Sequence, residues 1–192
     1  HIEKHLDNLI DEKALTCYGA DCRFLVAKPE IRRMEEDLAR VFAEGRKSNP
    51  HFGDSNTLVE VASEIDAELN GKQTAAVATA GKHLISLISG AAGSGKTRVI
   101  STITKLCESR NLKIVLCAPT GKAAKRIEES TGRKASTIHR LLGFDGKTYA
   151  RNAHNPISAD VVTVDEASMI DVALAWHLFN AIDLTRTAVV LV

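Results

Sequence analysis

Residues 90–97 read Gly-Ala-Ala-Gly-Ser-Gly-Lys-Thr and match the phosphate-binding pattern G-x-x-x-x-G-K-[ST]. An apolar run at 84–88 precedes this loop, and a stretch compatible with a helix follows at 98–109. Glycines let a backbone wrap around an anion with successive N–H groups pointing at it, and the start of a helix adds the positive end of its dipole. The succession of strand, loop and helix predicts a nucleotide-binding site.

The loop also predicts which side chains touch the nucleotide. Lys96 is expected to reach the β and γ phosphates of ATP, and the Thr97 hydroxyl is expected to help hold Mg²⁺. The candidate nucleotide-binding residues of this segment are Gly93, Ser94, Gly95, Lys96, Thr97 and Arg98.

A second candidate element lies 69 residues after Lys96, where the β-branched run 161–164 ends in Asp165 and Glu166. An acid at the tip of a buried parallel strand can hold Mg²⁺, and a neighbouring glutamate can orient and deprotonate the attacking water. Taken alone, the pair would fit a solvated strand end. Together with the loop it predicts catalysis by Lys96, Asp165 and Glu166, because both segments belong at the carboxyl edge of one sheet. The acid pair favours hydrolysis over transfer of phosphate to another substrate.

Composition is that of an ordinary globular protein. The chain has 192 residues, 44% of them hydrophobic and 26% charged, and a net charge of +1, so no global field indicates nucleic acid. Charge is uneven, however: residues 54–70 carry five acids and no Lys or Arg, whereas residues 121–140 are mostly basic. No signal peptide or membrane span is predicted, and we expect a cytoplasmic protein without membrane partners.

Four cysteines occur, and none suggests a metal site or a disulfide framework. Cys107 and Cys117 fall in a predicted helix and a predicted strand, and both are expected to be core thiols. Cys17 and Cys22 lie near each other, but no second pair completes a zinc site.

Periodicity predicts a mostly helical region before the loop. Helices are expected at 2–13, 29–45, 57–69 and 73–80, with short strands at 15–19 and 22–27 joined by a turn at Gly19-Ala20-Asp21. A helix followed by a hairpin is similar to the end of a winged-helix module, although a small packing appendage with no DNA role explains it slightly better.

From residue 84 onward strands and helices alternate. Strands are expected near 84–89, 113–118, 161–165 and 188–192, and helices near 96–109, 121–131, 136–142 and 171–182. Alternation with apolar strands predicts an α/β fold, a parallel sheet with helices on both faces. The chain begins at His1 and ends inside an apolar run, so we expect a fragment of a longer protein.

Two further segments narrow the function. Residues 118–126 read Ala-Pro-Thr-Gly-Lys-Ala-Ala-Lys-Arg and follow a predicted strand, with Thr120 placed to cap the next helix. Residues 135–144, Ala-Ser-Thr-Ile-His-Arg-Leu-Leu-Gly-Phe, again place polar and basic groups at a predicted helix start. Ordinary helix caps and a structural histidine would also explain them. A helix start and lysines nearby could instead hold phosphates of a nucleic acid.

Taken together, residues 73–192 resemble the first motor domain of superfamily 1 DNA helicases, in the RecD-like branch that includes the stand-alone RecD-like helicases and the exonuclease V alpha subunit. The resemblance rests on GAAGSGKT, APTGKAAKRIEESTG, ASTIHRLLGF and VDEASMID, in that order. It implies a RecA-like P-loop NTPase that uses ATP and Mg²⁺ to move 5′ to 3′ on single-stranded DNA and to unwind duplex in repair or recombination.

The resemblance also assigns residues. Gln73 matches the glutamine that reads the adenine edge, and Asp165 matches the residue that holds Mg²⁺. The residues expected along the DNA path are Pro119, Thr120, Lys122, Thr137 and His139.

The resemblance divides the chain into a winged-helix-like segment (1–45), a linker with a helix (46–72) and a motor domain shortened at its C-terminal end (73–192). Members of the branch continue into a second RecA-like domain, which supplies an arginine that completes the ATP site, and some work with other nuclease or helicase subunits. We therefore expect the 192 residues alone to be inactive or very weak as a motor. Two alternatives are a P-loop kinase or other ATPase independent of DNA, and an adaptor role for residues 1–45.

Overall fold

A parallel sheet forms the centre of the molecule. The computed structural model describes residues 2–17, 26–52, 55–91 and 93–192. In this part of the chain five strands form the sheet in the order β3-β7-β6-β4-β5, and every neighbouring pair is parallel. The strands are β3 (Ile85–Leu87), β4 (Ile114–Ala118), β5 (Ala135–Thr137), β6 (Val161–Val164) and β7 (Ala188–Leu191). The predicted α/β class is confirmed.

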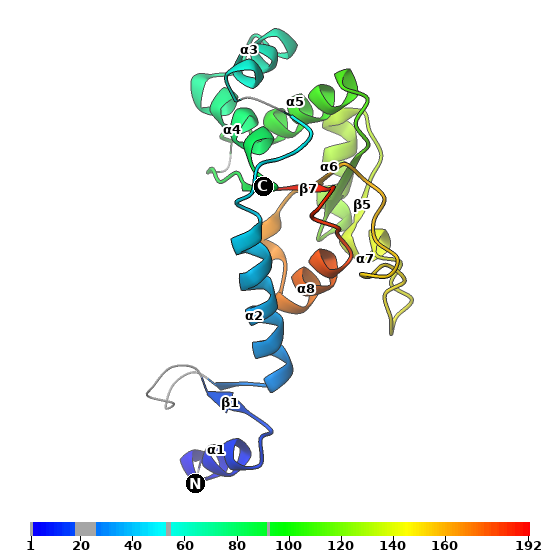
Figure 1. Cartoon of the computed structure of the whole chain (residues 1–192). Coiled ribbons are helices and arrows are strands. Elements are labelled where there is room, and N and C mark those ends of the chain that lie inside the picture. The colour runs from blue at the N-terminus through cyan, green and yellow to red at the C-terminus, as the bar shows by residue number, and fades with distance from the viewer. Residues whose placement is uncertain (1, 18–25, 53–54, 92) are drawn as a thin grey trace.

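Helices cover both faces of this sheet, as expected when parallel strands are joined by helical crossovers (Figure 1). One face carries α3 (Ser55–Ile65), α4 (Gly71–Lys82), α5 (Lys96–Ser109) and α6 (Gly121–Thr131). The other carries α2 (Pro29–Glu44), α7 (Ile138–Leu141) and α8 (Val172–Asn180). A short 3₁₀ turn, η1 (Ala167–Met169), lies between β6 and α8.

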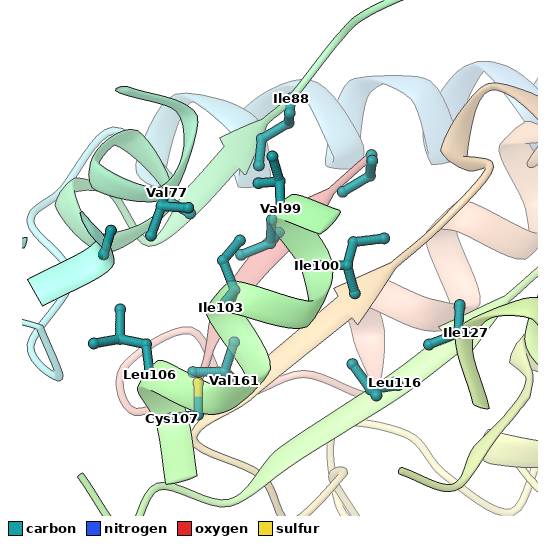
Figure 2. Packing of buried hydrophobic residues seen from close by; sticks show 14 of the residues in the cluster. Val77, Ile88, Val99, Ile100, Ile103, Leu106, Cys107, Leu116, Ile127 and Val161 are labelled. Carbon is teal, nitrogen blue, oxygen red and sulfur yellow. The ribbon is translucent and has the colours of Figure 1, made fainter. Parts of the chain in front are cut away.

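Alternation along each strand divides the core into two clusters, one per face, because successive side chains of a strand point to opposite sides. The pairs that separate in this way are Val161 and Val162, Leu116 and Cys117, and Val190 and Val189. Figure 2 shows the cluster on the α5 face, where aliphatic side chains of α5 lie against the sheet. Aliphatic side chains supply nearly all of this packing, as the scarcity of aromatic residues requires.

Cys107 and Cys117 confirm the prediction of core thiols. Both are free and fully buried, one in each cluster. Burial raises the pKa of each thiol to about 12, since a thiolate is poorly solvated there. Neither is therefore suited to act as a nucleophile.

The long helix α2 packs against α8 rather than standing apart (Figure 1). The Phe42 and Phe179 rings meet edge to face with centroids 5.1 Å apart, and Trp176 donates its indole N–H to Asp37 Oδ2 at 3.2 Å. Beyond α2, α1 (Ile2–Asp11) precedes a two-stranded antiparallel ribbon of β1 (Thr16–Cys17) and β2 (Val26–Ala27). The expected turn at 19–21 and Cys22 lie outside the described residues.

Two expected helices are wrong in extent. The helix expected at 57–69 ends at Ile65, because Asp66 accepts the Glu68 N–H and begins a turn. The helix expected at 136–142 is a strand and a short helix, because residues 135–137 pair with the edge of β4 before α7 begins. No helix in the described ranges is both long and apolar enough to cross a membrane.

Candidate nucleotide and DNA site

The phosphate loop joins β3 to α5, as its sequence predicts. Gly93 and Gly95 have φ values of +79° and +83°, which only glycine adopts without strain. Gly95 is also the N-cap of α5, and a Cβ there would overlap the Gln73 side chain. Lys96 lies on the first turn and donates from Nζ to the Gly90 carbonyl at 2.7 Å. Gly93 and Gly95 therefore have the left-handed backbone that the glycine pattern predicts, and the Lys96 ammonium group lies against the start of the loop.

Asp165 and Glu166 follow β6 at the same edge of the sheet. Strand β7 lies between β3 and β6, and Leu191 of β7 is level with both Leu87 and Val164. The loop and the acid pair consequently leave the sheet one strand apart, as the candidate site requires.

The Asp165 carboxyl is partly buried, which raises its pKa above the ordinary value, while Lys96 and Arg126 oppose that rise. A carboxylate that has lost solvation gains by meeting a cation. Asp165 and the Thr97 hydroxyl both carry hard oxygen donors of the kind that Mg²⁺ prefers, and their role in holding the ion stays a prediction.

Glu166 has an unusual backbone. Its φ of +56° is left-handed, which costs energy for a residue with a side chain and is typical of functional positions. Its carboxylate lies 3.9 Å from the Arg126 guanidinium of α6. The glutamate is thus held at the carboxyl edge, half-exposed and beside a basic helix.

Gln73 joins the first turn of α4 to the phosphate loop. Its Nε2 donates to the Ser94 carbonyl at 3.1 Å, and its Oε1 accepts the Asn70 N–H at 3.0 Å. Asn70 in turn accepts N–H groups of the same turn, which completes a capping box. The structure therefore places the Gln73 side chain against the phosphate loop, and its adenine-reading role stays a prediction.

Arg98 lies one residue beyond the loop, and its guanidinium is bound by two carboxylates. Nε and Nη2 donate to the two Asp66 oxygens at 2.6 and 2.7 Å, and Nη2 also donates to Glu68 at 2.6 Å. The Arg98 side chain lowers the pKa of Asp66, and both carboxylates raise the pKa of Arg98. Sequence reasoning singled out neither acid, although the acidic run at 54–70 contains both.

The segments that carry the residues expected along the DNA path leave the sheet at the other end of the same edge. Strands β4 and β5 are adjacent, with Ala118 level with Thr137, so the segments that begin at Pro119 and Ile138 emerge side by side. Thr120 accepts the Ala123 N–H at 3.2 Å and caps α6, as predicted. His139 is exposed, and its ring centroid lies 5.4 Å from that of Phe144. Lys122 is exposed on the first turn of α6.

Removing the Thr120 cap should weaken the fold measurably. Thr120→Ala leaves the Ala123 N–H without its partner, and we expect a loss of about 1 kcal/mol and a fall in Tm of about 2–4 °C. Thermal unfolding followed by circular dichroism measures this. Thr120→Ser keeps the hydroxyl and should stay within about 0.5 kcal/mol of the unmodified chain; equal Tm values for all three proteins would contradict the capping role.

The glycine-rich loop between a parallel strand and a helix, in a sheet covered on both faces, defines a P-loop NTPase of the α/β type. Residues 73–192 match the protein family described as AAA domain, and the chain belongs to that family.

Curated relatives place the chain with RecD-like helicases. It is 35% identical over 154 residues to the "ATP-dependent RecD2 DNA helicase" of Deinococcus radiodurans, a match that covers 80% of this chain and 22% of the relative. It is 40% identical over 136 residues to the "RecBCD enzyme subunit RecD" of Haemophilus influenzae, covering 57% of this chain and 21% of the relative. The resemblance drawn from the four motifs is confirmed. The chain spans about a fifth of the length of these two relatives.

Proposed function

We propose that this chain supplies the ATP-binding part of a DNA helicase that couples ATP hydrolysis to 5′-to-3′ movement on single-stranded DNA and to duplex unwinding. The observation that carries the proposal is the joint position of the phosphate loop, Asp165 and the Thr120 cap at one edge of the sheet. Ligands of open α/β sheets bind at that edge. A motor needs its ATP site and its DNA path close together, and the residues proposed for both lie at this edge.

In this proposal the loop backbone and Lys96 bind the phosphates, while Gln73 and Arg98 meet the base. Thr97 and Asp165 would hold Mg²⁺, which when bound neutralises charge on the β and γ phosphates. Glu166 would take a proton from the attacking water. The partly buried Asp165, with its raised pKa, supports this assignment, because a nearby cation would offset its desolvation.

Single-stranded DNA is the proposed partner on the β4–β5 side. Lys122 and the helix start at Thr120 would contact phosphates, and Pro119, Thr137 and His139 would line the path. A hydroxyl that accepts a cap hydrogen bond still has its own proton to donate, so Thr120 and Thr137 can cap their helices and contact phosphate at once. We also propose that a second RecA-like domain of the parent protein completes the site, and that the parent works in DNA repair or recombination, alone or with nuclease subunits.

Turnover of ATP by the 192-residue chain, with Mg²⁺ and with or without single-stranded DNA, tests this function. We expect ATP binding with turnover at least about 1,000-fold below that of a complete motor, since a completing arginine is worth about 10³–10⁵ in rate in related enzymes. Clear turnover stimulated by DNA would keep the helicase function and overturn the proposed weakness of the chain. Brisk turnover that ignores DNA, or phosphate transfer to a small acceptor, would favour a different class of P-loop protein.

A further inference from the structure

A compact ion cluster adjoins the nucleotide site without belonging to the phosphate loop. It consists of Asp66 and Glu68, in the connection between α3 and α4, and Arg98 on the first turn of α5. Asp66 binds the guanidinium through both oxygens, the fork geometry that fixes the plane of an arginine. The Asp66 side chain is only 15% exposed, whereas that of Glu68 is 80% exposed.

The connection that carries the two acids is itself rigid. Asp66 accepts the Glu68 N–H through its side chain and the Leu69 N–H through its carbonyl, both at 3.2 Å. The next residue, Asn70, caps α4 together with Gln73. One short segment therefore orients both Arg98 and Gln73, and α3, α4 and α5 lie together at this end of the molecule (Figure 1).

The charges of the cluster also affect which part of a ligand Arg98 can bind. An unpaired guanidinium beside the loop would draw the triphosphate toward itself. Asp66 and Glu68 occupy the Nε and Nη2 donors of Arg98, which leaves the flat face of the guanidinium free to stack on an aromatic ligand group. The Arg98–Glu68 ion pair is exposed and adds little to folding, so the main consequence of this pair is the orientation of Arg98.

We propose that Asp66 and Glu68 are positioning residues of the nucleotide site, which hold the Arg98 guanidinium in the orientation that receives the base of ATP. The inference rests on the proposed ATP-binding function, in which Arg98 and Gln73 meet the base. It adds a role for the two carboxylates that bind Arg98. The acids act through Arg98 and touch no part of the nucleotide.

Equilibrium binding of ATP, GTP and inorganic tripolyphosphate by the 192-residue chain tests the proposal. Asp66→Asn should weaken ATP binding about tenfold, the scale of one charge-assisted hydrogen bond, and should lower the preference for ATP over GTP. Binding of tripolyphosphate, which has no base, should stay within about twofold because the phosphate loop is intact. Asp66→Glu keeps the carboxylate and should restore part of the ATP affinity.

Glu68→Gln provides an independent variant at an exposed position, where folding is not at risk, and should weaken ATP binding about threefold, also without effect on tripolyphosphate. Glu60→Gln, an exposed acid on α3, is the matched control and should change nothing. The positioning role would be overturned if the variants weakened binding of ATP and of tripolyphosphate equally, or if both variants bound ATP as tightly as the unmodified chain. In either case, ATP binding by the unmodified chain would still support the proposed function. Failure of the unmodified chain to bind ATP would overturn both.

Discussion

Lys96→Ala should reduce ATP binding by about 100-fold. The ammonium group lies over the loop, with Nζ 2.7 Å from the Gly90 carbonyl, and is expected to exchange that contact for the β and γ phosphates. Two charge-assisted hydrogen bonds of about 1.5 kcal/mol each amount to about 3 kcal/mol, and each 1.4 kcal/mol is a factor of ten in affinity. Titration calorimetry with ATP and Mg²⁺ measures the loss directly.

Lys105→Ala is the matched control for that substitution. Lys105 lies on the same helix, is exposed, and lies beyond the phosphate loop. It should leave ATP binding and unfolding within about 0.5 kcal/mol of the unmodified chain. If Lys96→Ala bound ATP as tightly as Lys105→Ala, the assignment of residues 90–97 as the phosphate loop would be wrong.

The sequence predicted the elements that depend on local signals. The loop at 90–97 and the β-branched run at 161–164 carry their own patterns, and both lie at the expected edge of the sheet. The Thr120 cap was likewise predictable, because threonine before a helix is a local signal. The roles of the individual site residues remain predictions, since they depend on ligands.

The parts that sequence reasoning missed depend on contacts between distant segments. Strand β5 exists because Ala135, Ser136 and Thr137 lie beside β4, and three residues give too short a pattern to separate a strand from a helix start. The Asp66–Arg98 pair joins residues 32 positions apart. An acidic run predicts a solvated surface, and nothing in it shows which acid will meet an arginine.

Ile100→Ala should destabilise the fold more than any of the other substitutions, by about 3 kcal/mol. Ile100 is fully buried on α5, where Figure 2 shows it among the side chains between that helix and the sheet. Truncation removes buried methyl groups and leaves a cavity, and isoleucine-to-alanine changes in cores cost about 2–5 kcal/mol. Urea unfolding should show a lower midpoint with an unchanged slope.

Ile100→Val keeps most of the volume and should lose only about 1 kcal/mol. Ile100 lies one turn after Lys96 on the same helix. Ile100→Ala therefore tests how packing of α5 stabilises the fold, whereas Lys96→Ala tests phosphate binding by the loop. At temperatures well below its Tm, Ile100→Ala should still bind ATP, whereas Lys96→Ala should remain stable and bind poorly. A loss under about 1 kcal/mol for Ile100→Ala would mean that α5 is not packed on the sheet as described. Loss of ATP binding by folded Ile100→Ala would instead show that the loop depends on the fit of α5 against the sheet.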